Sequence, residues 1–199
     1  MSEPVVSGEL SLREGRYEHL VFGTVIEALH LDTDFQGLGT QGEPAVRFAL
    51  SGTDGIDGKL TVEGEVSQLG AGVPAVTART DIASMWLIRT DPATAQLSGT
   101  IDANLARGEG DVRGQVRIER AELRLLNNLP ASVVDLGPVE IVGEPPREAD
   151  TSPPAGDKIR LDLQVDFPDR IFIRGRGLDS EWGGNLDVSG TAAAPEVRG

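Results

Sequence analysis

Residues 158–199 read KIRLDLQVDFPDRIFIRGRGLDSEWGGNLDVSGTAAAPEVRG, and their opening part carries the clearest β pattern of the chain. Apolar side chains occupy every second position from 159 to 167, and charged or polar side chains occupy the positions between them. Successive residues of a strand point to opposite faces, so this period of two predicts one half-buried β-strand. The apolar positions are Ile159, Leu161, Leu163, Val165 and Phe167.

The remainder of this stretch predicts two more strands separated by turns. Proline lacks an N–H donor for a strand ladder and aspartate favours turns, so Pro168-Asp169 predicts a break. Residues 170–174 predict a second strand, and the glycines of residues 175–177 (GRG) permit the positive φ of a tight turn. Alternation resumes at residues 185–190. Because no helical period accompanies these segments, the stretch predicts an all-β unit.

The same alternation recurs through the rest of the chain. Residues 23–31 (GTVIEALHL) could form a helix or a strand, and the lack of an N-cap pattern favours a strand. Residues 14–15 (Glu-Gly) predict a turn, and residues 32–43 predict a glycine-rich loop or a short strand around Phe35. The other predicted strands are 6–12, 16–22, 45–50, 60–66, 75–82, the apolar core strand 85–88, 97–105, 112–118 and 119–125.

Residues 51–59 (SGTDGIDGK) combine two aspartates with three glycines, a composition that calcium loops share. An EF-hand requires a closing glutamate and flanking helices, and no helix is expected beside this segment. Asp-Gly between two strands is typical of a hairpin turn, which is therefore the favoured interpretation. The two histidines, His19 and His30, have no ligand spacing, and we expect structural positions for both and no metal site.

The composition excludes several classes of function. The 199 residues are 39% hydrophobic but only 4% aromatic, so any core is aliphatic and thin. The formal net charge of −14 argues against nucleic acid, whose phosphates require a basic surface, and against charge-driven docking on an anionic membrane. The chain has no cysteine, which excludes disulfide and thiol chemistry. No apolar run approaches the ~20 residues of a membrane helix, and residues 1–10 do not resemble a signal peptide.

The expected fold class is all-β, with little or no helix and ten or more strands in a long meandering sheet. Residues 1–199 are expected to form a single segment of a longer protein, in which an acidic, proline-rich loop at 143–157 interrupts the sheet and stays flexible. A short helical turn at 129–134 and a short strand at 139–142 are expected just before that loop. No amphipathic helix is expected to cover the apolar face of the strands. The sheet could therefore fold on itself as a sandwich, or curl into an open trough with an apolar interior; periodicity alone does not decide between them.

Residues 167–199 contain Arg-Gly-Arg-Gly-Leu (174–178), the acidic pair Asp179 and Glu181, and Trp-Gly-Gly before a Gly-Thr and Pro-x-x-x-Gly ending. This pattern resembles the segment near the carboxyl end of the TamB family of AsmA-like proteins. Upstream, GQVRIERAELRL (114–125) and LPASVVDLGPVEIVGE (129–144) resemble the preceding segment of the same family. The resemblance implies a long curved β groove with an apolar lining, which favours the trough.

The resemblance also implies a location and partners. The full-length protein is expected to be anchored in the inner membrane of a two-membrane bacterium, with this segment in the periplasm. Phospholipid acyl chains are the expected ligand, and a TamA-like outer-membrane barrel is a possible partner. The alternative function that the resemblance implies is assembly of outer-membrane proteins of the autotransporter type. The residues expected to line the groove are Leu97, Ile101, Val112, Val116, Ile118, Leu123, Leu125, Ile159, Leu161, Leu163, Val165, Ile171, Ile173, Leu186 and Val188.

Neither a catalytic residue nor a cofactor is expected. No nucleophile motif and no phosphate loop opening a helix occurs in the sequence. Asp179 and Glu181 could flank a sugar, but a chance pair is expected among 32 acidic residues. Arg170, Arg174 and Arg176 could meet a lipid phosphate, although pairing with neighbouring carboxylates is the favoured prediction because charges near one turn usually pair at the surface.

Overall fold

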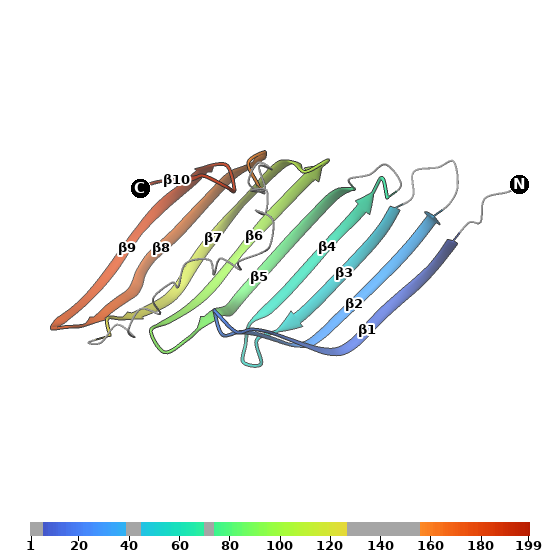
Figure 1. The fold of residues 1–199 in the computed structure, drawn as a ribbon. Coiled ribbons are helices and arrows are strands. Elements are labelled where there is room, and N and C mark those ends of the chain that lie inside the picture. The colour runs from blue at the N-terminus through green and yellow to red at the C-terminus, as the bar shows by residue number, and fades with distance from the viewer. Residues whose placement is uncertain (1–5, 39–44, 70–73, 127–155) are drawn as a thin grey trace, which may run out of the picture.

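The computed structural model describes residues 6–38, 45–69, 74–126 and 156–199. These residues form ten strands in a single sheet whose order follows the chain from β1 to β10 (Figure 1). The predicted all-β class and the sequential strand order are confirmed. The strands are β1 (Val6–His19), β2 (Thr24–Leu38), β3 (Ala45–Thr53), β4 (Lys59–Ser67), β5 (Ala75–Arg89), β6 (Ala93–Ala106), β7 (Glu109–Arg124), β8 (Ile159–Gly175), β9 (Leu178–Gly190) and β10 (Pro195–Arg198).

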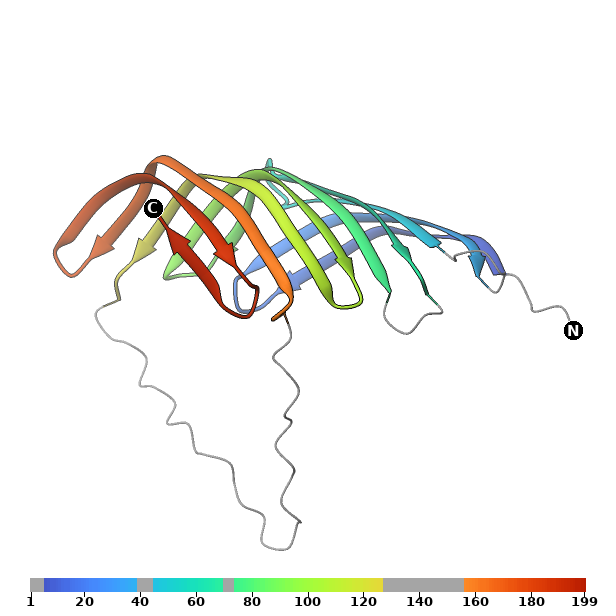
Figure 2. The ribbon, with the colours of Figure 1, turned by 90° about the horizontal axis from the view of Figure 1, so that it is seen from above.

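The sheet is curved and open. Seen from above, it arches from β1 to β9 without the two edge strands meeting (Figure 2). No second layer of described residues packs on either face, because every described strand belongs to this one sheet. Of the two alternatives, the open sheet favoured by the family resemblance is therefore the observed one, and the part of the chain that the structure describes does not form a sandwich. None of these described residues forms a helix that could cross a bilayer.

One pair of strands departs from a simple meander. All neighbours are antiparallel except β7 and β8, which run in the same direction from Gly110 opposite Ile159 to Arg124 opposite Arg174. The connection from β7 to β8 therefore starts at one end of the strands and returns to the sheet at the opposite end. The predicted helical turn at 129–134, the predicted strand at 139–142 and the part of the predicted flexible loop up to residue 155 lie outside the described residues.

β-Bulges replace two of the predicted turns. The turn predicted at residues 14–15 is wrong, because β1 continues through it with Glu14 at a φ of 56° and a shift of register beside it. The break predicted at Pro168-Asp169 is also wrong, because β8 runs unbroken through Asp169 and Arg170, at φ values of 60° and 78°. A bulge accommodates turn-favouring residues without ending the strand.

The structure also fixes the ends of β1 and β2. Of the two alternatives for residues 32–43, a loop or a short strand around Phe35, the strand is the observed one, because β2 extends to Leu38. The strand predicted at 16–22 ends at His19, since residues 20–23 form the turn between β1 and β2. The strand favoured over a helix for residues 23–31 is confirmed, because these residues belong to β2 from Thr24 onward.

Bulges occur in β1 and β2 and again in β5, β7 and β8, whereas β3 pairs with β4 and β4 pairs with β5 without a register shift. Ala28 in β2 has a φ of 47° beside the bulge of β1, and Ser84 in β5 has a φ of 48° beside the register shift between β6 and β7. The bulge of β8 at Asp169 follows on the other side of β7. A bulge bends its strand and increases the local twist. These bulges therefore contribute to the curvature of the strands seen in Figure 2.

Candidate functional site: an uncovered apolar sheet face

The strand register gathers the alternating apolar residues on one face of the sheet. Residues directly opposite each other in neighbouring strands point to the same side. All of the predicted lining residues except Leu125 lie on β6 to β9 and follow this register. Leu125 follows β7 directly, and its N–H donates to the Arg174 carbonyl at 2.7 Å. The pairs that the register brings together are Leu97 with Ile118, Val112 with Leu161, Val116 with Val165, Leu123 with Ile173, Val165 with Leu186 and Leu163 with Val188.

Each of the remaining predicted lining residues lies opposite a glycine or an alanine in one neighbouring strand. Ile101 faces Gly114, Ile159 faces Gly110, and Ile171 faces Ala121 and Trp182. The glycines form part of the apolar face because a side chain does not fit there: a Cβ on Gly114 would lie 2.4 Å from the Thr100 carbonyl oxygen. Rows of branched side chains therefore alternate with low points where the backbone itself forms the surface.

The apolar face extends over the amino-terminal half of the sheet, which the predicted lining residues did not include. Leu50 of β3 lies between Leu31 of β2 and Val62 of β4, and Val66 lies between Val46 and Val76. The signal that identifies these residues is the same period of two, present in every strand. The larger set on this face also includes Phe35, Phe48, Leu60, Ile82 and Leu105.

This face has almost no described protein laid across it. Among the described residues, the only apolar side chains that are buried are Met85 and Ala95. The predicted lining residues are half-buried, apart from Leu123, which is exposed. A folded core would bury such side chains nearly completely. This face of half-buried apolar side chains is therefore the candidate binding surface.

A small core around Asp54 stabilises the end of the sheet where the turn between β3 and β4 lies. The predicted hairpin at 51–59 is confirmed as the turn between β3 and β4, and Asp54 within it is buried. Its Oδ1 accepts hydrogen bonds from the N–H groups of Ile56 and Gly58, and its Oδ2 accepts one from Trp86, each at 2.9 Å. Burial raises the pKa of this carboxyl, but the three N–H donors and the Arg89 charge outweigh burial and hold the pKa below its usual range.

The same core ties β2 to β5 across the shorter β3–β4 hairpin. The Arg89 N–H donates to the Phe22 carbonyl at 2.9 Å, and the Thr24 hydroxyl donates to the Leu87 carbonyl. Met85, predicted to belong to a core strand, is fully buried here. His19 stacks on Phe22 with ring centroids 4.9 Å apart, and His30 Nδ1 lies 2.7 Å from the Ala28 carbonyl, so both histidines have structural contacts.

The opposite face of the sheet is polar and carries exposed ion pairs. Arg13 pairs with Asp32 at 2.7 Å, and Arg47 pairs with Glu65 at 3.3 Å. Exposed pairs of this kind contribute about 0–1 kcal/mol each, so their main effect is to keep this face in water. Two open hollows of about 750 and 780 Å³ lie among the long polar side chains of this face. Their charged lining suits water and ions rather than hydrocarbon.

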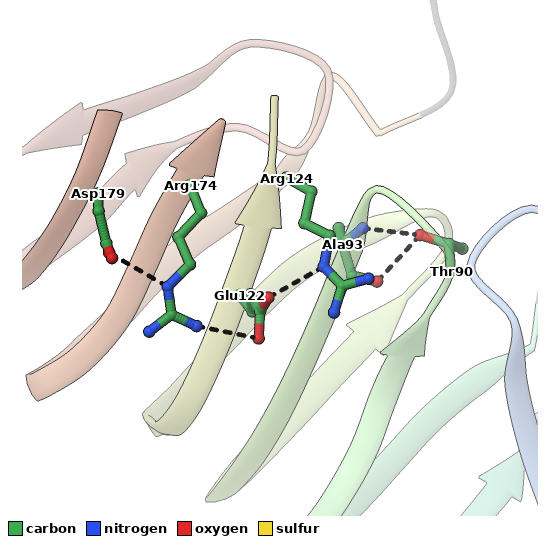
Figure 3. Close-up of polar contacts among 6 residues, drawn as sticks. All are labelled: Thr90, Ala93, Glu122, Arg124, Arg174 and Asp179. Atoms are coloured by element: carbon green, nitrogen blue, oxygen red, sulfur yellow. Dashed lines mark hydrogen bonds and ion pairs between the residues drawn. The ribbon is translucent and has the colours of Figure 1, made fainter. Parts of the chain in front are cut away.

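Arg174 of β8 and Arg124 of β7 lie beside carboxylates (Figure 3). Arg174 Nε donates to Asp179 Oδ1 at 3.1 Å, and Arg174 Nη1 lies 3.7 Å from Glu122 Oε2. The predicted pairing is thus confirmed for Arg174. The hydrogen bond from Arg124 to Glu122 at 3.0 Å, with the charge of Arg174, holds the pKa of Glu122 below its usual range.

The other two arginines make different contacts. Arg176 donates to the Leu126 carbonyl at 3.2 Å, and the backbone N–H of Arg170 donates to Glu181 at 3.1 Å. Arg174 alternates with Ile173, so it points away from the apolar face. These contacts leave the apolar face itself as the candidate site, without a cationic partner on it from Arg174.

The fold and this face define a class of protein: a single-layer, open β-sheet with one continuous apolar surface and one charged surface. The family model of the TamB C-terminal domain matches residues 47–199. The chain therefore belongs to the TamB family. Comparison with curated proteins and with solved structures finds no match for this chain.

Proposed function

We propose that this chain is a segment of a periplasmic bridge whose apolar sheet face shields phospholipid acyl chains as they pass between the inner and outer membranes. The observation that carries the proposal is the apolar face that no described element covers. Membership of the TamB family supports a role in the transport of lipid or protein across the envelope rather than catalysis. The curvature of the sheet would turn this face into the lining of a groove.

The dimensions of the sheet suit an acyl chain. One leaflet of a bilayer is about 15 Å of hydrocarbon, and strands lie about 4.8 Å apart, so a chain lying across the strands would contact three or four of them. One such row runs from Ile101 through Gly114 and Leu163 to Val188. Each buried CH₂ group contributes about 0.8 kcal/mol, and this contribution does not depend on the headgroup. The groove would therefore hold many lipids and select among them weakly.

A charge placed on this face tests the proposal. The variant Leu163→Arg puts a guanidinium in the middle of the apolar row, and Gln164→Arg puts the same charge on the next residue, which faces the polar side. We expect the unmodified chain and Gln164→Arg to carry phospholipid that native mass spectrometry detects after purification. Leu163→Arg should carry at least about tenfold less, because burying one unpaired charge costs several kcal/mol. Equal lipid in the two variants, or no lipid in the unmodified chain, would overturn the proposal.

A second candidate function is assembly of outer-membrane proteins with a TamA-like barrel, and the open edge of the sheet favours it. β10 pairs only with residues 187–190 of β9, so the earlier part of β9 presents an edge without a described neighbour. Such an edge can accept an added strand. If Leu163→Arg abolishes lipid capture and leaves binding of the barrel intact, the conduit function is supported. The reverse result supports assembly.

A further inference from the structure

The turn between β1 and β2 exposes three consecutive large apolar side chains. Leu20, Val21 and Phe22 are 87%, 73% and 53% exposed, respectively. Turns are normally built from glycine, proline, asparagine, aspartate and serine, so this composition is not explained by the requirements of the turn. Single exposed apolar residues are common in proteins, but a contiguous group at one point of the surface marks a contact site.

The tip formed by Leu20, Val21 and Phe22 is held in position by hydrogen bonds of the turn. The Gly23 N–H donates to the His19 carbonyl at 2.8 Å, which closes the turn, and the Phe22 carbonyl accepts the Arg89 N–H of β5. The Phe22 ring also stacks on the His19 ring with an interplanar angle of 16°. These contacts hold the backbone of Phe22 beside β5 and close the turn, with Leu20 and Val21 exposed to solvent.

The tip lies at an edge of the sheet that is apolar in several places. The turns that follow β1, β3, β5 and β8, and the end of β7, lie at the same end of the strands (Figure 1). Exposed apolar residues in this row are Ile56 between β3 and β4, Leu126 after β7 and Leu178 at the start of β9. Charged residues occur at both ends of the strands: Asp57, Asp91 and Arg176 lie in turns at the end with the tip, and Arg107 and Lys158 lie at the opposite end, where Leu69 is also exposed.

The chemistry of the tip suits a neutral lipid surface better than a protein. Three side chains offer roughly 300 Å² of apolar surface, whereas each partner in a stable protein interface contributes about 800 Å². The tip itself is uncharged, and the nearby Arg16 is occupied by Glu18 and Glu27 at 3.5 and 3.7 Å. With a net charge of −14, the chain has no electrostatic attraction to an anionic membrane. Hydrophobic insertion requires none.

We propose that the tip formed by Leu20, Val21 and Phe22 inserts into the interface of a zwitterionic phospholipid bilayer and docks this edge of the sheet on the membrane. This site is distinct from the apolar face, which would take single acyl chains out of a bilayer. Insertion places apolar side chains at the boundary of headgroups and hydrocarbon, while the polar face stays in water. The proposal holds or fails independently of the conduit function, because the tip does not belong to the lining.

The absence of cysteine makes a single-site probe straightforward. Val21→Cys, labelled with an environment-sensitive NBD dye, is mixed with phosphatidylcholine vesicles, and Arg107→Cys with the same dye reports on the opposite edge. We expect NBD at position 21 to brighten at least about twofold and to be quenched by lipids brominated on their acyl chains. NBD at position 107 should do neither. An increase that brominated lipid does not quench would overturn the proposal.

A second variant removes the tip without touching the groove. Leu20→Ser combined with Phe22→Ser keeps the Phe22 carbonyl that accepts the Arg89 N–H, and both side chains are exposed, so the fold should persist. We expect co-flotation with phosphatidylcholine vesicles to fall at least about tenfold, while Gln164→Arg, a change on the polar face, leaves it unchanged. Unchanged flotation of the double variant would overturn the proposal. A position-21 signal that appears without vesicles and rises with protein concentration would also overturn it, in favour of contact between copies of the chain.

Discussion

Replacing Asp54 by alanine tests whether the small core at the β3–β4 turn holds the sheet together at that edge. The Asp54 carboxylate is the acceptor for three backbone N–H groups, from Ile56, Gly58 and Trp86. Two of these groups belong to the turn and the third belongs to β5, so a single side chain joins the hairpin to the neighbouring strand. Alanine removes all three acceptors at once and leaves the N–H groups facing one another.

The expected loss follows from the surroundings of each N–H group. Gly58 is buried and Trp86 is half-buried, so water cannot readily replace the lost acceptor for either. Ile56 is exposed, and its N–H can bind water instead. A buried donor without an acceptor costs about 1–3 kcal/mol, so the two enclosed groups together predict a loss of about 3 kcal/mol in the free energy of unfolding. This loss is a large part of the roughly 5–15 kcal/mol that stabilises a typical domain.

Urea unfolding followed by far-ultraviolet circular dichroism measures this loss. The matched control is Asp57→Ala, which removes an exposed carboxylate from the same turn and should change the free energy of unfolding by less than about 0.5 kcal/mol. The dependence on urea concentration should stay the same in both variants, since the surface exposed on unfolding is unchanged. If Asp54→Ala loses no more stability than Asp57→Ala, the reasoning about this core is refuted.

Three further predictions concern charge and close packing. Because the pKa of Asp54 is lower in the folded chain than the unfolded value of about 3.9, its ionised carboxylate stabilises the fold fully above about pH 5, and this stabilisation is lost as the pH falls below about 3.9. The difference in urea midpoint between the unmodified chain and Asp54→Ala should therefore narrow towards about pH 2. A constant difference would contradict this. In Gly99→Ala the new Cβ would lie 2.2 Å from a backbone oxygen of β7, so the free energy of unfolding, measured by thermal unfolding, should fall by more than about 3 kcal/mol. The control Gly108→Ala, in an open turn, should lose about 1 kcal/mol. Equal losses would disprove the close approach. Arg174→Ala removes the ion pairs with Glu122 and Asp179 and should lower the free energy of unfolding by less than about 1 kcal/mol, and by less still at 1 M salt. A loss of stability that does not depend on salt would contradict the electrostatic assignment.

The alternation of apolar and polar residues predicted most of the strands because each strand has one face towards water. In β8, the residues from Ile159 to Phe167 follow the period of two, and the structure places them in one strand. The errors fall at Glu14 and at Pro168-Asp169, where residues that favour turns occupy bulges inside strands. Local sequence does not distinguish a turn from a bulge at such positions, since both use the same positive φ. The neighbouring strand decides the outcome by continuing to pair beyond the irregularity.

The parallel pairing of β7 and β8 is a second feature that sequence did not reveal. Both strands alternate cleanly, and their pattern fits an antiparallel neighbour as well as a parallel one. Direction depends on where the connection returns to the sheet, and the period of two carries no information about this. The exposed tip at Leu20, Val21 and Phe22 was missed for a similar reason. In the sequence these residues continue the predicted strand 16–22, and only the position of the turn shows that they point into solvent.

The sequence by itself determined that this chain is all β, which residues share a face, and that one face is apolar while the other is charged. These properties are local, because side-chain direction alternates along a strand regardless of what lies nearby. Only the tertiary structure decided that the apolar face stays uncovered over the described residues. Coverage is a long-range property: the same ten strands could have folded into two facing layers, but each strand pairs with the next in one open sheet, and bulges in several strands add to its curvature.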